Sequence, residues 1–153
     1  MSFVIEKTLD IHASAEQVWQ VLTDFPRFPE WNPFVVRCQS TLKPGEAYDM
    51  HVKLMAKPQH QVEWIIEHVP GRKYAYGMKP FPLGALRSYR SHEVVPAGAG
   101  RARYTSYWRL EGWMVPLVRA IMGSRIETGM RGMWEGLQKR SEQLWAQRQN
   151  KAA

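Results

Sequence analysis

A chain of 153 residues, with 44% hydrophobic and 23% charged residues, is long enough to fold as one globular domain with its own core. No stretch is long and apolar enough to span a bilayer, and the opening residues, MSFVIEKTLD, lack the apolar region of a secretory signal. Because Cys38 is the only cysteine, an internal disulfide is excluded, and we expect a protein of the reducing cytoplasm. The net charge of +7 is uneven, since residues 1–76 carry −1 and residues 77–153 carry +8.

The first 34 residues predict a strand followed by two short helices. Apolar and polar residues alternate over residues 3–11, as in a half-buried strand. Ser14 is placed as an N-cap with Gln17 three residues later, which is the pattern of a capping box. A second helical turn should end at Trp31-Asn32-Pro33-Phe34, because a proline disfavours helical geometry in the residue before it.

From residue 35 the hydrophobic period changes to two, which predicts six further strands. Proline and glycine separate them in short connections, and short connections favour an antiparallel meander. The expected strands are Val35–Leu42, Tyr48–Leu54, Gln59–Val69, Tyr74–Lys79, Ala85–Val95 and Arg101–Gly112.

The stretch from Pro116 to about Arg148 reads as one long helix, with Pro116 in its first turn. Its apolar residues form one stripe at helical spacing. Gly129, Gly132 and Gly136 lie near the centre of that stripe, and each costs a helix about 1 kcal/mol relative to alanine. Two interpretations stay open: close packing against a sheet, or room left for a ligand.

The order of elements predicts an α+β fold in which one curved antiparallel sheet of about seven strands wraps around the long helix. Residues 1–148 should form the single domain, and residues 149–153 a frayed tail.

Several short motifs carry a family resemblance. The segment IHASAEQVW at residues 11–19 resembles one from the START-like superfamily, also called SRPBCC or Bet v 1-like. WNPF at residues 31–34 is similar to the same motif in its polyketide cyclase/dehydrase-like branch. The turn at 69–72, the strand end at 111–112 and residues 137–142 also match. The resemblance covers nearly the whole chain and implies a helix-grip fold. It does not imply one activity, because the fold hosts lipid carriers, hormone receptors, cyclases and oxygenase domains.

The resemblance implies a deep apolar cavity between the sheet and the long helix, which would bind a hydrophobic or aromatic small molecule, such as a lipid, for transport or sequestration. Strand alternation independently turns aromatic and methionine side chains toward the helix, including Val62, Trp64 and Ile66 of the strand over 59–69. A filled core is the alternative. The expected ligand-binding residues are Trp31, Phe34, Met50, Val52, Trp64, Tyr76, Met78, Phe81, His92, Trp108, Met122, Ile126, Gly129 and Met133.

An enzyme of the cyclase/dehydratase type, working without a cofactor, is an alternative function. Arg90, His92 and Ser106, with Lys7, would then form a small polar cluster in the cavity and polarise a ligand carbonyl. The favoured alternative is that Arg90 and Lys7 lie at the cavity mouth and pair with surface carboxylates. We expect no metal, because the five histidines show no metal-binding spacing.

The basic second half leaves a third alternative, an interaction module. Arginines and tyrosines share the outward parity of the last two strands, and such a face could bind RNA or an anionic membrane. A solvated face is favoured, and we expect no nucleic-acid partner. The apolar connection from Gly112 to Val118 could be a packed loop, a gate, a dimer contact or a membrane-touching edge. The protein should be a monomer or a homodimer. The arginines and tyrosines on the outward face of the last two strands are Arg87, Tyr89, Arg101, Arg103, Tyr107 and Arg109.

Overall fold

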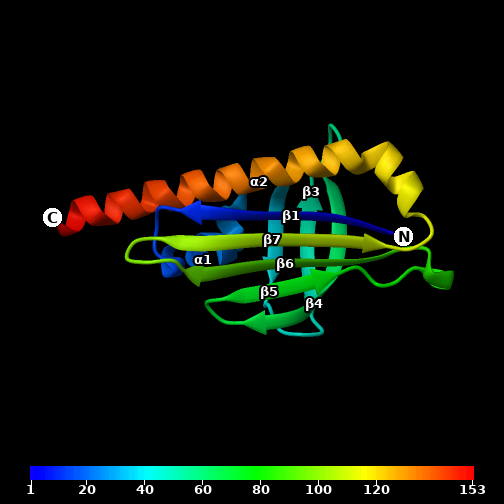
Figure 1. Cartoon of the computed structure of the whole chain (residues 1–153), viewed down its shortest axis with the longest axis horizontal. Coiled ribbons are helices and arrows are strands. Elements are labelled where there is room, and N and C mark those ends of the chain that lie inside the picture. The colour runs from blue at the N-terminus through cyan, green and yellow to red at the C-terminus, as the bar shows by residue number, and fades with distance from the viewer.

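The computed structural model describes all residues from Met1 to Ala153 (Figure 1). A strand, two short helices, six strands and one long helix follow each other along the chain. The elements are β1 Ser2–Ile11, α1 Ala15–Thr23, η1 Phe25–Glu30, β2 Val35–Ser40, β3 Ala47–Val52, β4 Gln59–Val69, β5 Lys73–Gly77, η2 Pro82–Gly84, β6 Arg87–Pro96, β7 Ala102–Glu111 and α2 Val115–Ala152.

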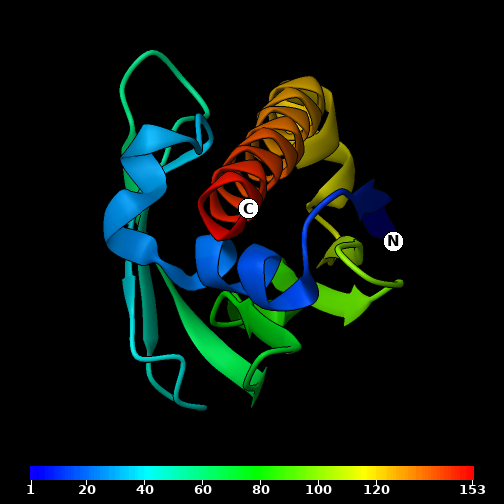
Figure 2. The ribbon, with the colours of Figure 1, turned by 90° about the vertical axis from the view of Figure 1, so that its left-hand side faces the viewer.

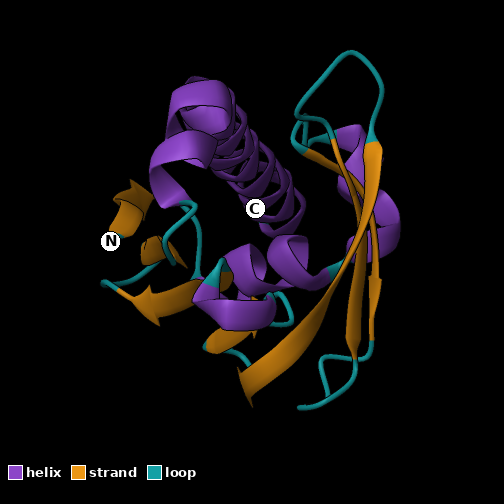
Figure 3. Cartoon of the chain, turned by 90° about the vertical axis from the view of Figure 1, so that its right-hand side faces the viewer, coloured by secondary structure: helices purple, strands orange, loops and turns teal.

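All seven strands form one antiparallel sheet in the order β1-β7-β6-β5-β4-β3-β2. The sheet curves around α2, so that strands lie on two sides of the helix (Figure 3). In Figure 2, which looks along α2 from its C-terminal end, α1 lies beneath the long helix on the concave side of the sheet. This is the predicted α+β helix-grip fold.

The predicted boundaries differ from the observed ones mainly at element ends. β5 stops at Gly77 rather than Lys79, and β6 starts at Arg87 rather than Ala85, because the prolines of the connection between them lack amide donors. The long helix starts one residue before Pro116 and continues to Ala152. Residues 149–152, expected in a frayed tail, are therefore helical.

The predicted inward face of β4 is wrong. Val62 and Ile66 are 41% and 52% exposed, whereas Gln61 and Glu63 pair with the inward-facing Met50 and Tyr48 of β3. A register shift between Ile65 and Glu67 marks a bulge. Since the outward residues of β4 are the apolar ones, hydrophobic alternation assigns the wrong face to this strand.

The solid part of the core lies under α1 and the second half of α2. Val18, Leu22 and Phe28 are completely buried there and belong to the same cluster as Met133 and Leu137 of α2. Ser14 accepts a hydrogen bond from the Gln17 amide, as the capping box predicts, and this fixes the start of α1. Inward-pointing rings of the central strands lie stacked or tilted on one another beside this core: Tyr48, Tyr74, Tyr76, His92 and Tyr104.

The three glycines of α2 pack against the segment Trp31–Phe34. A Cβ atom on Gly129 would overlap the ring of Phe34, one on Gly132 would lie 2.9 Å from Cγ of Pro33, and one on Gly136 would overlap the carbonyl oxygen of Trp31. Close packing therefore explains these glycines, although the partner is this segment rather than the sheet. They do not provide a void.

Asn32 holds the Trp31–Phe34 segment in shape. Its buried side-chain oxygen accepts hydrogen bonds from the amides of Phe34 (3.0 Å) and Val35 (2.9 Å). These two bonds turn the chain from η1 into β2 and direct the ring of Phe34 toward α2.

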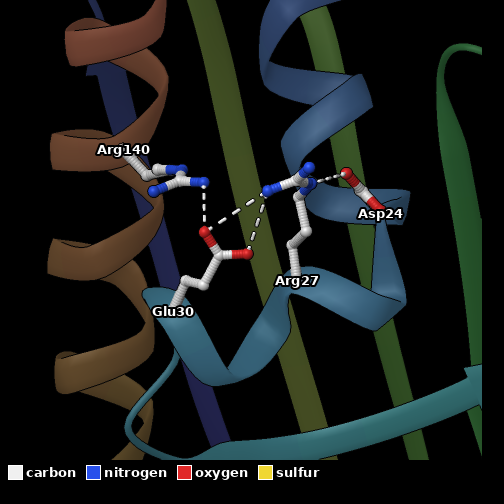
Figure 4. Close-up of polar contacts among 4 residues, drawn as sticks. All are labelled: Asp24, Arg27, Glu30 and Arg140. Atoms are coloured by element: carbon white, nitrogen blue, oxygen red, sulfur yellow. Dashed lines mark hydrogen bonds and ion pairs between the residues drawn. The ribbon is translucent and has the colours of Figure 1, made fainter.

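A network of four charged residues joins η1 to the second half of α2 (Figure 4). Arg140 donates to Glu30 at 3.0 Å, Arg27 lies 3.2 Å from the same carboxylate, and Arg27 also lies 3.5 Å from Asp24. The hydrogen bond from Arg140 is the main reason why the pKa of Glu30 lies below its ordinary value, with Arg27 adding to the effect. The network ties the glycine-packed half of the helix to η1, which directly precedes the Trp31–Phe34 segment.

Candidate functional site

A cavity of about 610 Å³ lies between the sheet and the first half of α2. Of the 22 residues that border it, 17 are hydrophobic, which is typical of a small-molecule site. The bordering residues are Phe34, Val35, Met50, Val52, Leu54, Gln61, Val62, Glu63, Trp64, Tyr76, Met78, Lys79, Phe81, Leu86, Ser88, Arg90, Trp108, Leu110, Val118, Met122, Ile126 and Met130.

Most of the residues predicted to bind a ligand border this cavity. One of them, Trp64, belongs to the outward parity of β4, and the Lys79 ammonium lies 4.5 Å from the centre of its ring. The predicted residues at the cavity are Phe34, Met50, Val52, Trp64, Tyr76, Met78, Phe81, Trp108, Met122 and Ile126.

Four predicted residues do not border the cavity. Trp31 lies at surface grooves on the other side of the α2 contact, and Gly129 is covered by the ring of Phe34. His92 is completely buried among tyrosine rings, and Met133 is buried next to the guanidinium of Arg90. These four residues support the cavity wall or the helix contact instead.

Arg90 on β6 is the buried cation of the site, with only 4% of its surface exposed. Its Nε donates to Nε2 of His92 at 3.2 Å. Its Nη1 and Nη2 point to the sulfur atoms of Met130 (3.2 Å) and Met133 (3.6 Å). The guanidinium therefore holds its position on the cavity wall through neutral partners, two of them weak acceptors.

His92 is a neutral histidine that positions Arg90. Burial, followed by the charge of Arg90, lowers its pKa well below the ordinary value. Because Nε2 accepts the hydrogen bond from Arg90, the ring proton resides on Nδ1, which lies 2.7 Å from the hydroxyl oxygen of Tyr104 and donates to it. Ser106, opposite His92 in the sheet, is completely buried and does not border the cavity.

Lys7 lies outside this cluster. It is an exposed residue of the edge strand β1 and pairs with Ser106 only through the backbone register. Of the polar residues predicted to converge, the structure therefore brings together Arg90, His92 and Ser106, and only Arg90 borders the cavity.

Glu63 is the cavity residue that the sequence interpretation missed. It borders the cavity together with Arg90 and Ser88. Burial raises its pKa to about 7, against the opposing effects of the Arg90 charge and a hydrogen bond with Ser88. At neutral pH this carboxyl group can therefore either donate or accept a proton. The signal that would have found it is the register with β3, because Tyr48 faces inward and pairs with Glu63.

The sequence of this chain matches one known protein family. The family model described as "Polyketide cyclase / dehydrase and lipid transport" matches residues 2–142. The chain belongs to this family. A comparison with curated protein sequences found no match.

Solved structures share the fold of this polyketide cyclase/dehydrase and lipid transport family member. The Zhui aromatase/cyclase from Streptomyces sp. R1128 superposes with a TM-score of 0.75 at 14% identity, covering 93% of this chain and 94% of that one. A START superfamily protein from Mycobacterium smegmatis gives 0.70 at 17% identity, covering 92% and 98%. Norcoclaurine synthase from Thalictrum flavum gives 0.68 at 18% identity, covering 92% and 94%. An aromatase/cyclase, a START superfamily protein and a synthase thus share the architecture of this family member.

The outward basic face is mostly ion-paired. Arg87 and Arg109 lie 2.8 Å and 3.5 Å from Glu111, and Arg103 lies 3.3 Å from Asp10. These pairs leave fewer free cations than the sequence pattern indicates. An interaction module on this face stays a prediction.

The connection between β7 and α2 is only partly packed. Val115 is buried, whereas Trp113 is 65% exposed and donates from its indole to the carbonyl oxygen of Leu83 at 3.2 Å. Leu117 and Ile121 are also exposed, close in sequence to the cavity residue Val118. The gate, the dimer contact and the membrane-touching edge all stay predictions. No helix of the structure has the length and apolar character needed to cross a membrane.

No three metal-ligating side chains come together in the structure. Cys38 is buried, and burial raises the pKa of its thiol to about 12, so the reactive thiolate is suppressed. The ionisable side chains bordering the cavity are Glu63, Tyr76, Lys79 and Arg90, with the Ser88 hydroxyl among them.

Proposed function

We propose that this protein binds a hydrophobic or aromatic small molecule in the cavity between its sheet and α2, and that it transports or sequesters that molecule. The observation that carries the proposal is the cavity of about 610 Å³ with 17 hydrophobic residues among its 22 neighbours. Small-molecule sites commonly measure about 300–1,000 Å³. A lipid tail or a fused aromatic system fits this volume.

The composition of the wall supports an apolar ligand. Methionines such as Met50, Met122 and Met130 adapt to irregular shapes, and aromatic rings such as Trp108 offer flat contacts. Apart from Lys79 in the connection after β5, the few polar side chains lie on the sheet wall, which is an arrangement that orients one polar end of a ligand.

The test is saturable binding of the neutral fluorescent dye N-phenyl-1-naphthylamine, combined with native mass spectrometry of the freshly purified protein. Met122→Trp fills the cavity and should abolish dye binding. Ile121→Trp is the matched control. Ile121 directly precedes Met122 in α2 but is 63% exposed, so its substitution should leave the cavity open. Absence of both saturable dye binding and a co-purifying molecule in the unaltered protein would contradict the proposal.

A cofactor-independent enzyme of the cyclase/dehydratase type is the second candidate. The carboxyl group of Glu63, with a pKa of about 7, favours it because this group borders the same cavity as the Arg90 guanidinium. Glu63 would remove a proton next to a ligand carbonyl, and Arg90 would stabilise the resulting enolate oxygen. His92 would hold Arg90 rather than touch the ligand.

Deuterium exchange at the carbon next to the carbonyl of 4-phenylbutan-2-one, followed by NMR in D₂O, tests this chemistry. The protein should accelerate the exchange, and Glu63→Gln should remove the acceleration. Glu67→Gln is the control on the same strand, because Glu67 pairs with Lys73 (3.2 Å) away from the cavity. If the exchange rate with the unaltered protein equals the rate in buffer alone, Glu63 is not a general base for ketones.

A further inference from the structure

The guanidinium of Arg90 has no anionic partner. No carboxylate oxygen lies within 4.0 Å of it, and its three hydrogen bonds go to an imidazole and two thioethers. Charges that are 96% buried are normally paired, because removing an ion from water costs several kcal/mol. With five N–H donors and three of them assigned, two donors are left without an acceptor.

The nearest acid of the cavity does not supply the missing charge. Glu63 is on β4 and Arg90 on β6, with β5 between them, so their backbones lie two strand spacings, or about 10 Å, apart. Tyr76 of β5 pairs with Arg90, and its ring faces the same cavity. The two charged side chains therefore border the same cavity without forming an ion pair.

Three of the five donors of Arg90 are already occupied. Met130, which borders the cavity, and Met133 present their sulfur atoms to Nη1 and Nη2, and His92 accepts from Nε. Because Arg90 also borders the cavity, the contents of the cavity are what can reach its free donors. A planar guanidinium matches the two oxygens of a carboxylate better than it matches a single hydroxyl or ketone oxygen.

We propose that the ligand of this cavity is a hydrophobic carboxylic acid, bound with its carboxylate on Arg90 and its apolar body along the methionine and aromatic wall. This inference rests on the proposed function, since it specifies the ligand class of the same cavity. Glu63 then lies beside the bound carboxylate and, in its protonated form, donates a hydrogen bond to it. His92 is a positioning residue that fixes the direction of the guanidinium.

The test compares anthracene-2-carboxylic acid with its methyl ester, two fluorescent probes with the same ring system. At pH 6 the acid should bind at least about tenfold more tightly than the ester, since the ester forfeits a charge-assisted bidentate contact. Arg90→Met should bring this ratio to about one. Arg90→Lys, which keeps the charge but loses the planar fork, should give an intermediate ratio. Arg87→Met, on the exposed end of the same strand, should keep the full preference.

The outcomes separate the inference from the function on which it rests. If N-phenyl-1-naphthylamine binds but the unaltered protein shows no preference for the acid, the ligand class is wrong and the cavity is still a binding site. If neither the dye nor either anthracene binds, both fail. The thermal midpoint of unliganded Arg90→Met gives a second reading. It should rise or stay constant, because the substitution removes an unpaired buried charge, whereas a large fall would make Arg90 a structural residue and overturn the inference.

Discussion

The ring of Phe34 lies against the backbone of Gly129, on the face of α2 where any side chain would overlap it. Phe34 also borders the cavity, so one aromatic ring separates the solid half of the core from the hollow half. The glycines and the cavity are thus neighbours, but the glycines serve the helix contact. The room for a ligand lies in the cavity and not beside the glycines.

Gly136→Ala should destabilise the protein. The new Cβ atom would overlap the carbonyl oxygen of Trp31, and this backbone is held by the neighbouring turn of Asn32. Overpacking costs about 1–3 kcal/mol, of which the better helix propensity of alanine returns about 1 kcal/mol. Urea denaturation measures the difference.

Gly123→Ala on the same helix is the control for this prediction. The closest atom to its new Cβ would be Cγ of Arg119 at 3.4 Å, an ordinary contact. We expect a gain of about 1 kcal/mol from helix propensity alone. Equal gains in both variants would show that the contact with Trp31 is not tight.

Met133→Arg should unfold the protein or lower its stability by at least about 3 kcal/mol. Met133 is 1% exposed, and its sulfur lies 3.6 Å from Nη2 of Arg90, so the substitution would place a second unpaired cation beside the first. Met133→Leu, which nearly conserves volume, should cost less than about 1.5 kcal/mol. A soluble arginine variant with an unchanged melting temperature would refute the assignment of this helix face.

Binding of anthracene-2-carboxylate should weaken about tenfold between pH 6 and pH 8. Glu63, whose pKa burial raises to about 7, is mostly protonated at the lower pH and mostly ionised at the higher one, where it repels the bound carboxylate. The other charged or titratable side chains bordering the cavity are Tyr76, Lys79 and Arg90, and burial raises the pKa of the Tyr76 hydroxyl above its ordinary value. Glu63→Gln should remove the pH dependence, and its persistence in that variant would exclude Glu63 as the cause.

The ion pair between Glu30 and Arg140 should contribute stability only above acidic pH. The pKa of Glu30 is lowered on folding, so its contribution is complete above the ordinary pKa of a glutamate, about 4.3, and is lost as pH falls through the lower folded value. The effect should be small, because these charges are exposed to solvent. Between pH 7 and pH 3, Glu30→Gln should therefore lose slightly less thermal stability than the unaltered protein. Glu127→Gln, at an exposed position of α2 without an ion pair, should behave like the unaltered protein.

The fold follows from local patterns in the sequence. Alternating strands such as β3 and β7, turn residues between them and the long stripe of α2 each predict their own element. Their order leaves few arrangements other than a sheet around the helix. The ends of β5 and β6 differ from the prediction because the prolines of the connection between them lack the amide donors that strand pairing needs.

The site was only partly predictable, for a physical reason. When the inward face of a strand is assigned from hydrophobic alternation, the apolar face is taken to point inward. This rule fails where a cavity is lined by polar side chains. β4 turns Gln61 and Glu63 inward and leaves Val62 and Ile66 exposed, so the strand that carries the ionisable group is the one whose face was reversed. The partner of the helix glycines was equally hidden, because Trp31 and Gly136 are far apart in the sequence.

The two halves of α2 have different roles. The first half borders the cavity, and the second half makes the contacts that stabilise the fold. Val118, Met122 and Ile126 border the cavity, whereas the contacts of Gly132, Gly136 and Arg140 with the Trp31–Phe34 segment and η1 hold the fold together. Exchanging side chains in the first half reshapes the cavity while the glycine contacts stay intact. A protein built in this way can acquire a new ligand through a few substitutions in three turns of helix, with its folding stability supplied from elsewhere.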